Sequence, residues 1–432
     1  MIMLLRFRIA NHRSILEPVE LSMIAVDQDR AATRGFDGLS ERVMTVAGIY
    51  GPNASGKSNV LDAMAWLSMA VATSLRGWED YIPRDAHRFG EGPASPSEFD
   101  LDMVVEGVRY TYRLEVDDSA VLFESLDCYP EGRRRNLFTR HKSEIDFRRG
   151  LEGTRGIRDL LTPTTLALSA GRRVSDSDVK SVGRAIARMR VLGLRRRRSL
   201  GAIGVYPFDP TIRLLFEADE ADQLEFFSTP EDRPVFTDPS GVLDLLRFAD
   251  PGIGDFVIRE EESGRPGGRR RNLGLIHRGK GEPVTFDLED ESAGTRTWFR
   301  LIGPAFAALR SGRVLLLDEI DASLHPRLSA RLIEIFQDPQ TNTRNAQLVF
   351  TSHDTSLLNG LNRDEVWLTE KAPDATTRLV GLAEFGGEHV RRSLNLERAY
   401  LQGRFGAVPE VDQVAVRRAL GLVSQRRDGQ AD

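Results

Sequence analysis

The stretch Gly51-Pro-Asn-Ala-Ser-Gly56-Lys57-Ser58 matches the phosphate-binding pattern G-x-x-x-x-G-K-[ST] at every fixed position. An apolar run at residues 46–50 precedes it, and residues 60–71 carry apolar side chains at helical spacing. The motif requires a strand before the loop and a helix after it, so a chance glycine-rich turn explains the stretch poorly. The sequence therefore predicts a nucleoside triphosphate site.

The residue types of this loop fit the chemistry of a triphosphate. Backbone N–H groups of a glycine-flanked loop can surround the β-phosphate, and the helix start adds its dipole. Lys57 can place a point charge on the β/γ oxygens, and Ser58 can offer its hydroxyl to Mg²⁺. We predict that ATP is bound by consecutive residues of this segment: Asn53, Ala54, Ser55, Gly56, Lys57, Ser58 and Asn59.

Length and composition set the broad class. The chain has 432 residues, which allows two or three domains, and its apolar content of 41% and charged content of 28% are those of a globular protein. A net charge of −5 argues against a chain that binds nucleic acid over its whole surface. The single cysteine, Cys128, excludes an internal disulfide and a Cys-based zinc site. Arg6 and Arg8 interrupt the first apolar run, and no stretch is long enough to span a bilayer, so we expect a cytoplasmic protein.

A second strand-like segment, residues 313–317, ends in two acids. Four consecutive apolar residues suit a central parallel strand. Asp318 at its end can hold Mg²⁺ together with Ser58, and Glu319 is placed to polarise a water for attack on the γ-phosphate. The alternative is a strand end with two solvated acids, which the nearby phosphate loop disfavours.

A third strand-like segment, residues 347–351, leads into Ser352, His353 and Asp354. A histidine is more often structural than catalytic. A strand that neighbours the Asp-Glu strand would nevertheless carry His353 to the γ-phosphate, where it could sense or stabilise charge. We therefore predict Glu319, His353 and Asp318 as the catalytic residues.

Glu291-Ser292-Ala293-Gly294-Thr295 precedes a helix-like segment. Ser292 and Gly294 would form an anion-binding helix N-terminus. Ser-x-Gly alone is a weak motif, because many helices begin this way. Its value comes from the order of the four segments along the chain: phosphate loop, Ser-x-Gly helix, Asp-Glu strand and His strand.

With these motifs in this order, the chain resembles the ABC-like ATPases of the SMC, RecF and OLD clan. More narrowly, it resembles the coiled-coil-free ATPases of RloA and AbiL type from bacterial anti-phage defence loci. The resemblance covers nearly the whole chain and is carried by six segments: residues 7–14, 50–58, 291–296, 317–326, 351–354 and 400–409. Three departures are His12 in place of an aromatic residue, the Ser-Ala-Gly form of the signature, and the lack of a clear Q-loop glutamine.

The resemblance implies partners as well as a fold. In this family the helix at Ser292 and Gly294 completes the nucleotide site of a second subunit, so ATP is sandwiched in a homo-oligomer. It also implies that Asn11 and Arg13 lie at the nucleotide. The chain carries no second catalytic constellation, and we expect no metal-ligand cluster away from the phosphate loop. A separate toxin or nuclease effector is therefore expected.

The fold class predicted is α/β: an ATPase head with a parallel sheet and an antiparallel β-lobe, carrying a mixed insertion. Heptads are absent from the insertion, so no long coiled coil is expected. We expect a hairpin at 98–116 turning at Glu106 and Gly107, a strand at 123–129, and helices at 174–194 and 244–249. The expected domains are 1–120 and 285–409 as the two halves of the ATPase, 121–284 as an inserted subdomain, and 410–432 as a tail.

The sequence contains three arginine clusters, at 133–135, 195–198 and 269–271. The simpler interpretation is a solvated surface on which acids balance these charges. The alternative is a surface that binds nucleic acid. The function predicted is ATP binding and hydrolysis as the sensor or regulatory subunit of an abortive-infection system. Two alternatives are a RecF-like DNA-binding ATPase in repair or recombination, and a nucleotide switch that never turns over.

Overall fold

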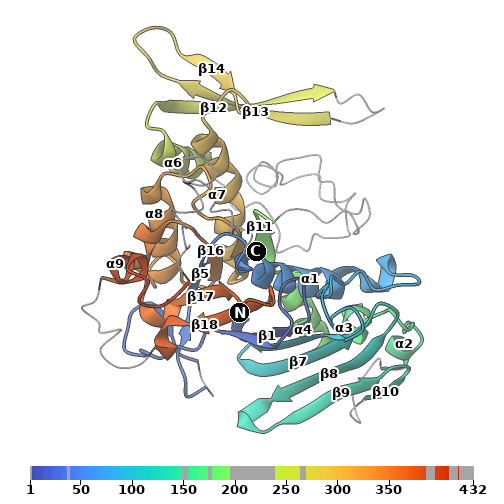
Figure 1. Cartoon of the computed structure of the whole chain (residues 1–432). Helices are drawn as coiled ribbons and strands as arrows, with labels where there is room; N and C mark the ends of the chain where they lie inside the picture. Colours follow the sequence, from blue (N-terminus) through green and yellow to red (C-terminus); the bar gives the residue numbers. More distant parts are fainter. Residues whose placement is uncertain are drawn as a thin grey trace, which may run out of the picture.

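The computed structural model describes residues 2–36, 39–147, 154–173, 178–194, 239–262, 269–385, 395–407 and 417. Their strands form sheets of six, seven and three strands and a two-stranded ribbon of β3 (Thr33–Arg34) and β4 (Val43–Met44). In Figure 1 the seven-stranded sheet lies at the lower right and the three-stranded sheet projects at the top. The described residues thus form an α/β fold in which a mainly parallel sheet lies beside antiparallel ones.

The six-stranded sheet carries the phosphate loop. Its first five strands are parallel and its last is antiparallel. In spatial order they are β11 (Arg190–Leu192), β15 (Val314–Leu317), β16 (Gln347–Thr351), β5 (Val46–Tyr50), β17 (Val366–Lys371) and β18 (Thr377–Gly381). The strands predicted at 46–50, 313–317 and 347–351 are confirmed as β5, β15 and β16. All of their residues are buried, as a parallel sheet covered on both faces requires.

Alternate side chains of the central strands enter two different cores. Val314 and Leu316 pack into one apolar cluster with the helix α1 (Lys57–Gly77) and the seven-stranded sheet. Leu315 and Leu317 pack into the other, with α7 (Ala293–Ser311) and α8 (Pro326–Gln337). The sheet is therefore a middle layer, and both predicted helices that follow site motifs, α1 and α7, pack against it.

The seven-stranded antiparallel sheet is the predicted β-lobe. Its spatial order is β10 (Glu144–Phe147), β9 (Arg135–His141), β8 (Val121–Tyr129), β7 (Val108–Val116), β6 (Ser97–Val105), β1 (Ile2–Ala10) and β2 (Val19–Ser22). The predicted hairpin is confirmed, with a two-residue turn in which Glu106 (φ 52°) and Gly107 (φ 85°) are both left-handed. Because β8 pairs along β7, the boundary expected after residue 120 passes through one continuous sheet.

The segment expected to be helical at 174–194 is only partly so. The helix α4 spans Asp178–Ala187 and packs with α3 (Ala167–Gly171) on α1. The continuous-helix prediction is wrong beyond it, because Arg190–Leu192 pairs with β15 as the edge strand β11. Residues 174–177 lie outside the described part. The other predicted helix, at 244–249, is confirmed within α6 (Pro239–Ala249).

The remaining antiparallel sheet belongs to the insertion. It contains β12 (Ile253–Glu262), β13 (Arg269–His277) and β14 (Val284–Asp287), and it follows α6 directly. The arginine cluster 269–271 thus lies on β13, while 195–198 lies outside the described residues. The described residues also form the α-helices α2 (Thr154–Arg158) and α9 (Leu396–Leu401). Among the described helices, none has both the length and the apolar character that spanning a bilayer demands.

Candidate nucleotide site

The phosphate loop joins β5 to α1 and needs its glycines for two reasons. Gly51 (φ 150°) and Gly56 (φ 104°) adopt backbone conformations that side chains disfavour. A Cβ at Gly51 would overlap the carbonyl oxygen of Thr369, and one at Gly56 would overlap Oγ1 of Thr377. The loop therefore lies directly on β17 and β18, with no room for a side chain between them.

Hydroxyl groups of β17 and β18 contact the phosphate loop and support it. Ser55 Oγ lies 2.6 Å from Thr369 Oγ1, and Thr377 Oγ1 donates to the carbonyl oxygen of Ser55 at 2.8 Å. The same Thr377 hydroxyl lies 2.7 Å from Ser14 Oγ, which accepts from Asn59 Nδ2 at 2.6 Å. The side chains of Ser55 and Asn59 thus support the loop, whereas Asn53 and Ala54 at its tip are exposed.

Lys57 is the cation of the site. Its Nζ donates to the carbonyl oxygens of Gly51 at 2.8 Å and Pro52 at 3.1 Å, and it lies 3.5 Å from Nδ1 of His353. Burial lowers the pKa of Lys57 to about 8, although the charges of Asp318, Asp321 and Glu319 oppose this shift. A triphosphate in the loop would supply the anionic oxygens that this ammonium lacks.

Ser58 and Asp318 are brought together as predicted for a metal site. Ser58 Oγ donates to Asp318 Oδ1 at 2.9 Å, and Thr351 Oγ1 donates to the same oxygen at 2.6 Å. A hydroxyl and a carboxylate are the oxygen ligands that Mg²⁺ takes beside substrate phosphates. The donor set therefore fits Mg²⁺, with Thr351 orienting the carboxylate.

The loops that carry Glu319 and His353 are tied to each other. The backbone N–H of Glu319, a left-handed residue (φ 54°), donates to Thr351 Oγ1 at 2.8 Å. Asp321 Oδ1 accepts from Ser352 Oγ at 2.9 Å and from the backbone N–H of His353 at 3.3 Å. Both predicted catalytic side chains are exposed at the carboxyl edge of the sheet, the edge at which ligands bind in open α/β sheets.

Ser292 caps α7, as predicted. Its Oγ accepts from the backbone N–H of Thr295 at 3.1 Å, and the residue is exposed. A Cβ at Gly294 would lie 3.1 Å from the carbonyl oxygen of Ser323, so the start of α7 lies against the loop that follows β15. The hydroxyl of Ser292 contacts Thr295 of its own helix, and the residue is open to solvent.

Asn11 does not have the role that the resemblance implied. It is buried, and its Nδ2 donates to the carbonyl oxygens of Gly92, Ser95 and Pro96 at 2.7–3.1 Å, while its Oδ1 accepts from the backbone N–H of His87. The hydrogen bonds of the Asn11 amide thus hold the segment 87–96 in place. The prediction of a nucleotide contact by Asn11 is therefore corrected to a structural role.

Arg13 lies beside the first turns of α1. Its guanidinium forms ion pairs with Asp62 and Asp85, both at 3.1 Å, and its Nη1 donates to Asn59 Oδ1 at 3.4 Å. Two carboxylates already neutralise this cation. Its side chain is 26% exposed, so a nucleotide contact by Arg13 stays a prediction.

The structure adds residues that the sequence did not single out. Thr351 and Asp321 organise the acidic edge, and Thr369 and Thr377 support the phosphate loop. Gly193 (φ 83°) lies against Asp318, where a Cβ would overlap the Asp318 carbonyl oxygen. Thr351 and Asp321 stood within predicted motifs and could have been named; the others are distant in sequence from every motif.

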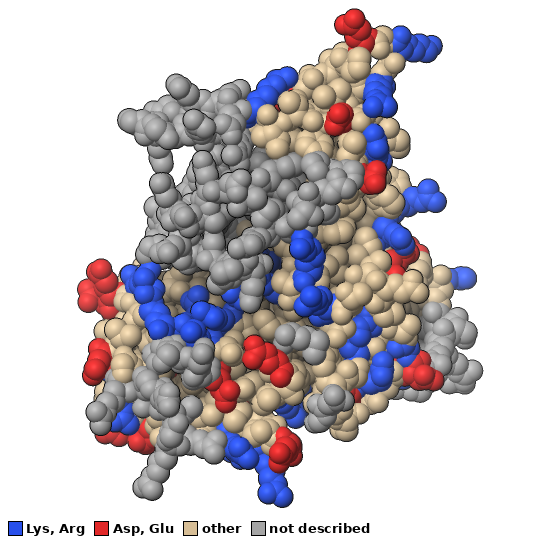
Figure 2. All heavy atoms as spheres, turned by 180° about the vertical axis from the view of Figure 1, so that it is seen from behind, with Lys and Arg blue, Asp and Glu red and all other residues tan. Residues whose placement is uncertain are grey.

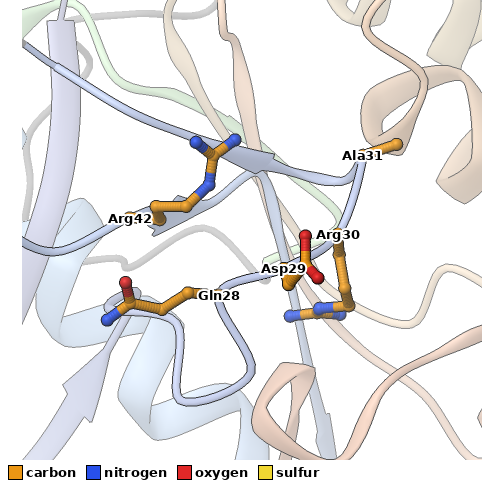
Figure 3. A pocket seen from close by; sticks show the side chains of 5 residues that line it. All are labelled: Gln28, Asp29, Arg30, Ala31 and Arg42. Atoms are coloured by element: carbon orange, nitrogen blue, oxygen red, sulfur yellow. The ribbon is translucent and has the colours of Figure 1, made fainter.

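A cavity of about 420 Å³ lies elsewhere, lined by Gln28, Asp29, Arg30, Ala31 and Arg42 (Figure 3). Its arginines are engaged. Arg30 donates to Asp364 Oδ1 at 2.7 Å, and Arg42 Nη2 donates to the carbonyl oxygen of Thr33 at 2.7 Å. Because its cations already have partners, the cavity does not compete with the phosphate loop as a nucleotide site.

Similar solved structures include the SMC head domain from Thermotoga maritima (11% identity, 88% of this chain, 98% of that chain, TM-score 0.37). They also include the Smc head domain with a coiled coil and joint derived from Pyrococcus yayanosii (13% identity, 94% of this chain, 100% of that chain, TM-score 0.44). No curated protein matches the chain.

A family model described as "AAA domain, putative AbiEii toxin, Type IV TA system" matches residues 46–359. This match covers well over half of the chain and runs from β5 through the phosphate loop and β15 to β16 and the segment after His353. The chain therefore belongs to this AAA-domain family and is a P-loop ATPase.

Proposed function

We propose that the chain binds and hydrolyses ATP through Lys57, Ser58, Asp318, Glu319 and His353. The observation that carries the proposal is the meeting of the phosphate loop with the ends of β15 and β16, which puts Ser58 Oγ 2.9 Å from Asp318 and Lys57 Nζ 3.5 Å from His353. Lys57 would hold the β/γ oxygens, and Glu319 would take the proton of the attacking water. When bound beside Ser58 and Asp318, Mg²⁺ would neutralise charge on the same oxygens.

We further propose that a second copy completes the site. Ser292 and the first N–H groups of the 19-residue helix α7 form an exposed anion-binding terminus. In the ABC-like family that the sequence resembles, this helix faces the phosphate loop of the partner subunit. The exposure of Ser292 supports this arrangement, in which two ATP molecules lie in a two-fold interface.

The biological role proposed is that of a sensor or regulatory subunit in a bacterial anti-phage system with a separate effector. The family description, which names an AbiEii toxin and a type IV toxin–antitoxin system, supports the defence part of this role. The test is phage plaquing on cells that express the chain with its neighbouring gene. Protection should disappear with Lys57→Ala and persist with Lys280→Ala, at an exposed lysine between β13 and β14. Protection that survives Lys57→Ala would contradict the proposal.

A second candidate is a RecF-like, nucleic-acid-stimulated ATPase. Burial and then the charges of neighbouring arginines lower the pKa of Arg172 to about 10; these neighbours are Arg173, Arg188 and Arg184. Basic groups from α4 and the end of α3 thus gather in one place, as phosphate-backbone binding requires. On the face drawn in Figure 2, however, basic side chains occur together with acidic ones, and Arg134 of another cluster is paired with Asp127 at 2.9 Å.

The two candidates differ in a simple measurement. The RecF-like function predicts ATP turnover stimulated by DNA, with a stimulation that falls as salt rises and that Arg173→Glu with Arg184→Glu removes. The defence function predicts dependence on the neighbouring gene product. DNA stimulation without any effect of that gene product would favour the RecF-like function.

A further inference from the structure

Three potential metal ligands converge away from the phosphate loop. Asp250 follows α6, His277 ends β13, and Glu291 directly precedes the Ser292 cap of α7. One ligand atom from each lies within 4.8 Å of the other two. This cluster, found among the described residues, corrects the expectation that no ligand cluster lies outside the nucleotide site.

Regular elements fix the positions of the three residues. His277 pairs with Ile253 across β13 and β12, and the backbone N–H of Arg278 donates to the carbonyl oxygen of Gly252 at 3.1 Å. Trp298 of α7 donates through Nε1 to the carbonyl oxygen of Leu245 in α6 at 2.7 Å. The two helices and the sheet are thereby joined around the cluster, so its geometry does not depend on long loops.

Local contacts hold the three side chains in place. Asp250 Oδ1 accepts from the backbone N–H of Gly252 at 2.8 Å, which orients the carboxylate. A Cβ at position 252 would lie 3.0 Å from that oxygen and 3.5 Å from His277 Nδ1, so glycine keeps the space between Asp250 and His277 narrow and free of side chain. His277 Nε2 lies 2.8 Å from Glu291 Oε1.

The simpler interpretation is a histidine–carboxylate pair that only braces the loop before α7. The side chain of Glu291 is 7% exposed and that of His277 is 23% exposed, which suits a bracing pair. The hydrogen bond from Gly252 orients Asp250, but neither it nor the His277–Glu291 pair accounts for three ligand atoms within 4.8 Å of one another. Arg296, the nearby cation, donates to the carbonyl oxygens of Glu289 and Glu291 at 2.7 and 2.8 Å.

We propose that Asp250, His277 and Glu291 bind a divalent transition-metal ion, with Zn²⁺ the ion that they fit best. One imidazole and two carboxylates with a partly open side match a zinc site in which water takes the fourth position. Mg²⁺ and Ca²⁺ prefer oxygen ligands alone, so the imidazole favours zinc over them. Tetrahedral ligands at about 2.0–2.2 Å stand roughly 3.3 Å apart, so Nε2 and Oε1 would separate by about half an ångström on binding.

The proposed metal site lies next to the start of α7. Glu291 is adjacent to Ser292, so an ion held by Glu291 ties the entry of α7 to α6 and to β13. The segment 288–292 should therefore become more protected from hydrogen exchange when the ion binds. This effect is independent of nucleotide and does not require the proposed function.

The experiment uses the tag-free full chain, stripped with a chelator, without nucleotide and with excess Mg²⁺ to saturate the Ser58–Asp318 site. Calorimetric titration with Zn²⁺ should show one equivalent bound, and Co²⁺ should give the visible absorption of a low-coordinate site. Asp250→Asn, which keeps the acceptor for Gly252, and His277→Gln should each weaken Zn²⁺ binding at least about tenfold. His141→Gln, at an exposed histidine of β9, and Asp318→Asn should leave it unchanged.

Three outcomes would overturn the assignment. They are no Zn²⁺ binding by the folded wild-type chain, equal binding by wild type and both ligand variants, or loss of binding only with Asp318→Asn. Melting curves taken with chelator present check that each variant folds. If His277→Gln does not fold, the test rests on Asp250→Asn. Unchanged hydrogen exchange at 288–292 on Zn²⁺ addition would reject the coupling to α7.

Discussion

At the scale of single residues, the site depends on a few charged groups whose surroundings set their chemistry. Lys57 is buried against the carbonyl oxygens of its own loop, which partly compensate its charge but cannot neutralise it. Asp318 receives two hydroxyl donors, whereas Glu319 next to it is exposed. Neighbouring acids in such different settings suit different roles, one orienting a cation and the other meeting water.

ATP affinity should depend on pH through Lys57. Its pKa in the nucleotide-free protein is lowered to about 8, and only the protonated form attracts phosphate. Affinity should therefore be full below pH 8 and fall by about tenfold per pH unit above it. Phosphate groups titrate near pKa 6, outside this window. Calorimetry from pH 7 to 9.5 measures the slope.

The matched control for this slope is Lys57→Arg, because a guanidinium stays protonated throughout the range. Its affinity should change little with pH, whatever its absolute value. A flat wild-type profile would contradict the assignment. The same shift makes the stability of the nucleotide-free fold rise as pH increases from 8 to 10.5, because the unfolded chain binds more protons than the folded chain in that range.

Glu319→Gln should keep ATP binding and lower turnover by at least about 100-fold, since the amide cannot take a proton from water. Phosphate release and nucleotide binding are measured on the same preparation. Glu334→Gln, on the exposed face of α8, is the control and should turn over ATP normally. Near-normal phosphate release by Glu319→Gln would show that another group is the base.

At the scale of elements, the phosphate loop is set by its packing as much as by its own sequence. Two strands far away in the chain, β17 and β18, supply Thr369 and Thr377, and each lies where a Cβ on Gly51 or Gly56 would stand. The loop therefore packs directly against these two strands. The motif glycines are needed for contact with the sheet in addition to their backbone angles.

This predicts a difference between two left-handed glycines. Gly56→Ala should cost backbone strain and also displace Thr377, so both stability and ATP binding should fall. Gly107→Ala, in the β6–β7 turn with open space around it, should cost only strain of about 1–2 kcal/mol and leave ATP binding intact. Denaturant melts and calorimetry separate the two effects. Equal behaviour of the two variants would refute the packing explanation.

At the scale of the whole molecule, Ser292 at the start of α7 is exposed, and the phosphate loop packs against β17 and β18. The two features would meet only between molecules if the proposed two-fold arrangement holds. Mixing defective chains tests it. Ser292→Arg should let each chain bind ATP but block hydrolysis, and Lys57→Ala should block binding.

A mixture of Ser292→Arg and Lys57→Ala chains should regain part of the ATPase activity, because one composite site then has both Lys57 and Ser292 intact. Ser143→Arg, in the exposed β9–β10 turn, controls for the added arginine and should be active alone. Absence of recovery at every mixing ratio, with both variants folded, would argue against shared sites.

The sequence by itself determined the phosphate loop, the Asp318–Glu319 strand and the family, because each is a contiguous segment whose chemistry is local. Strand and helix around the loop followed from periodicity alone. Only the tertiary structure decided that Arg190–Leu192 is a strand, since the edge of the parallel sheet offered hydrogen bonds that outweighed helical spacing. It also decided that Asn11 supports a loop, and it brought Asp250, His277 and Glu291 together from separate elements. Such convergence leaves no periodic or contiguous pattern, because packing between elements creates it.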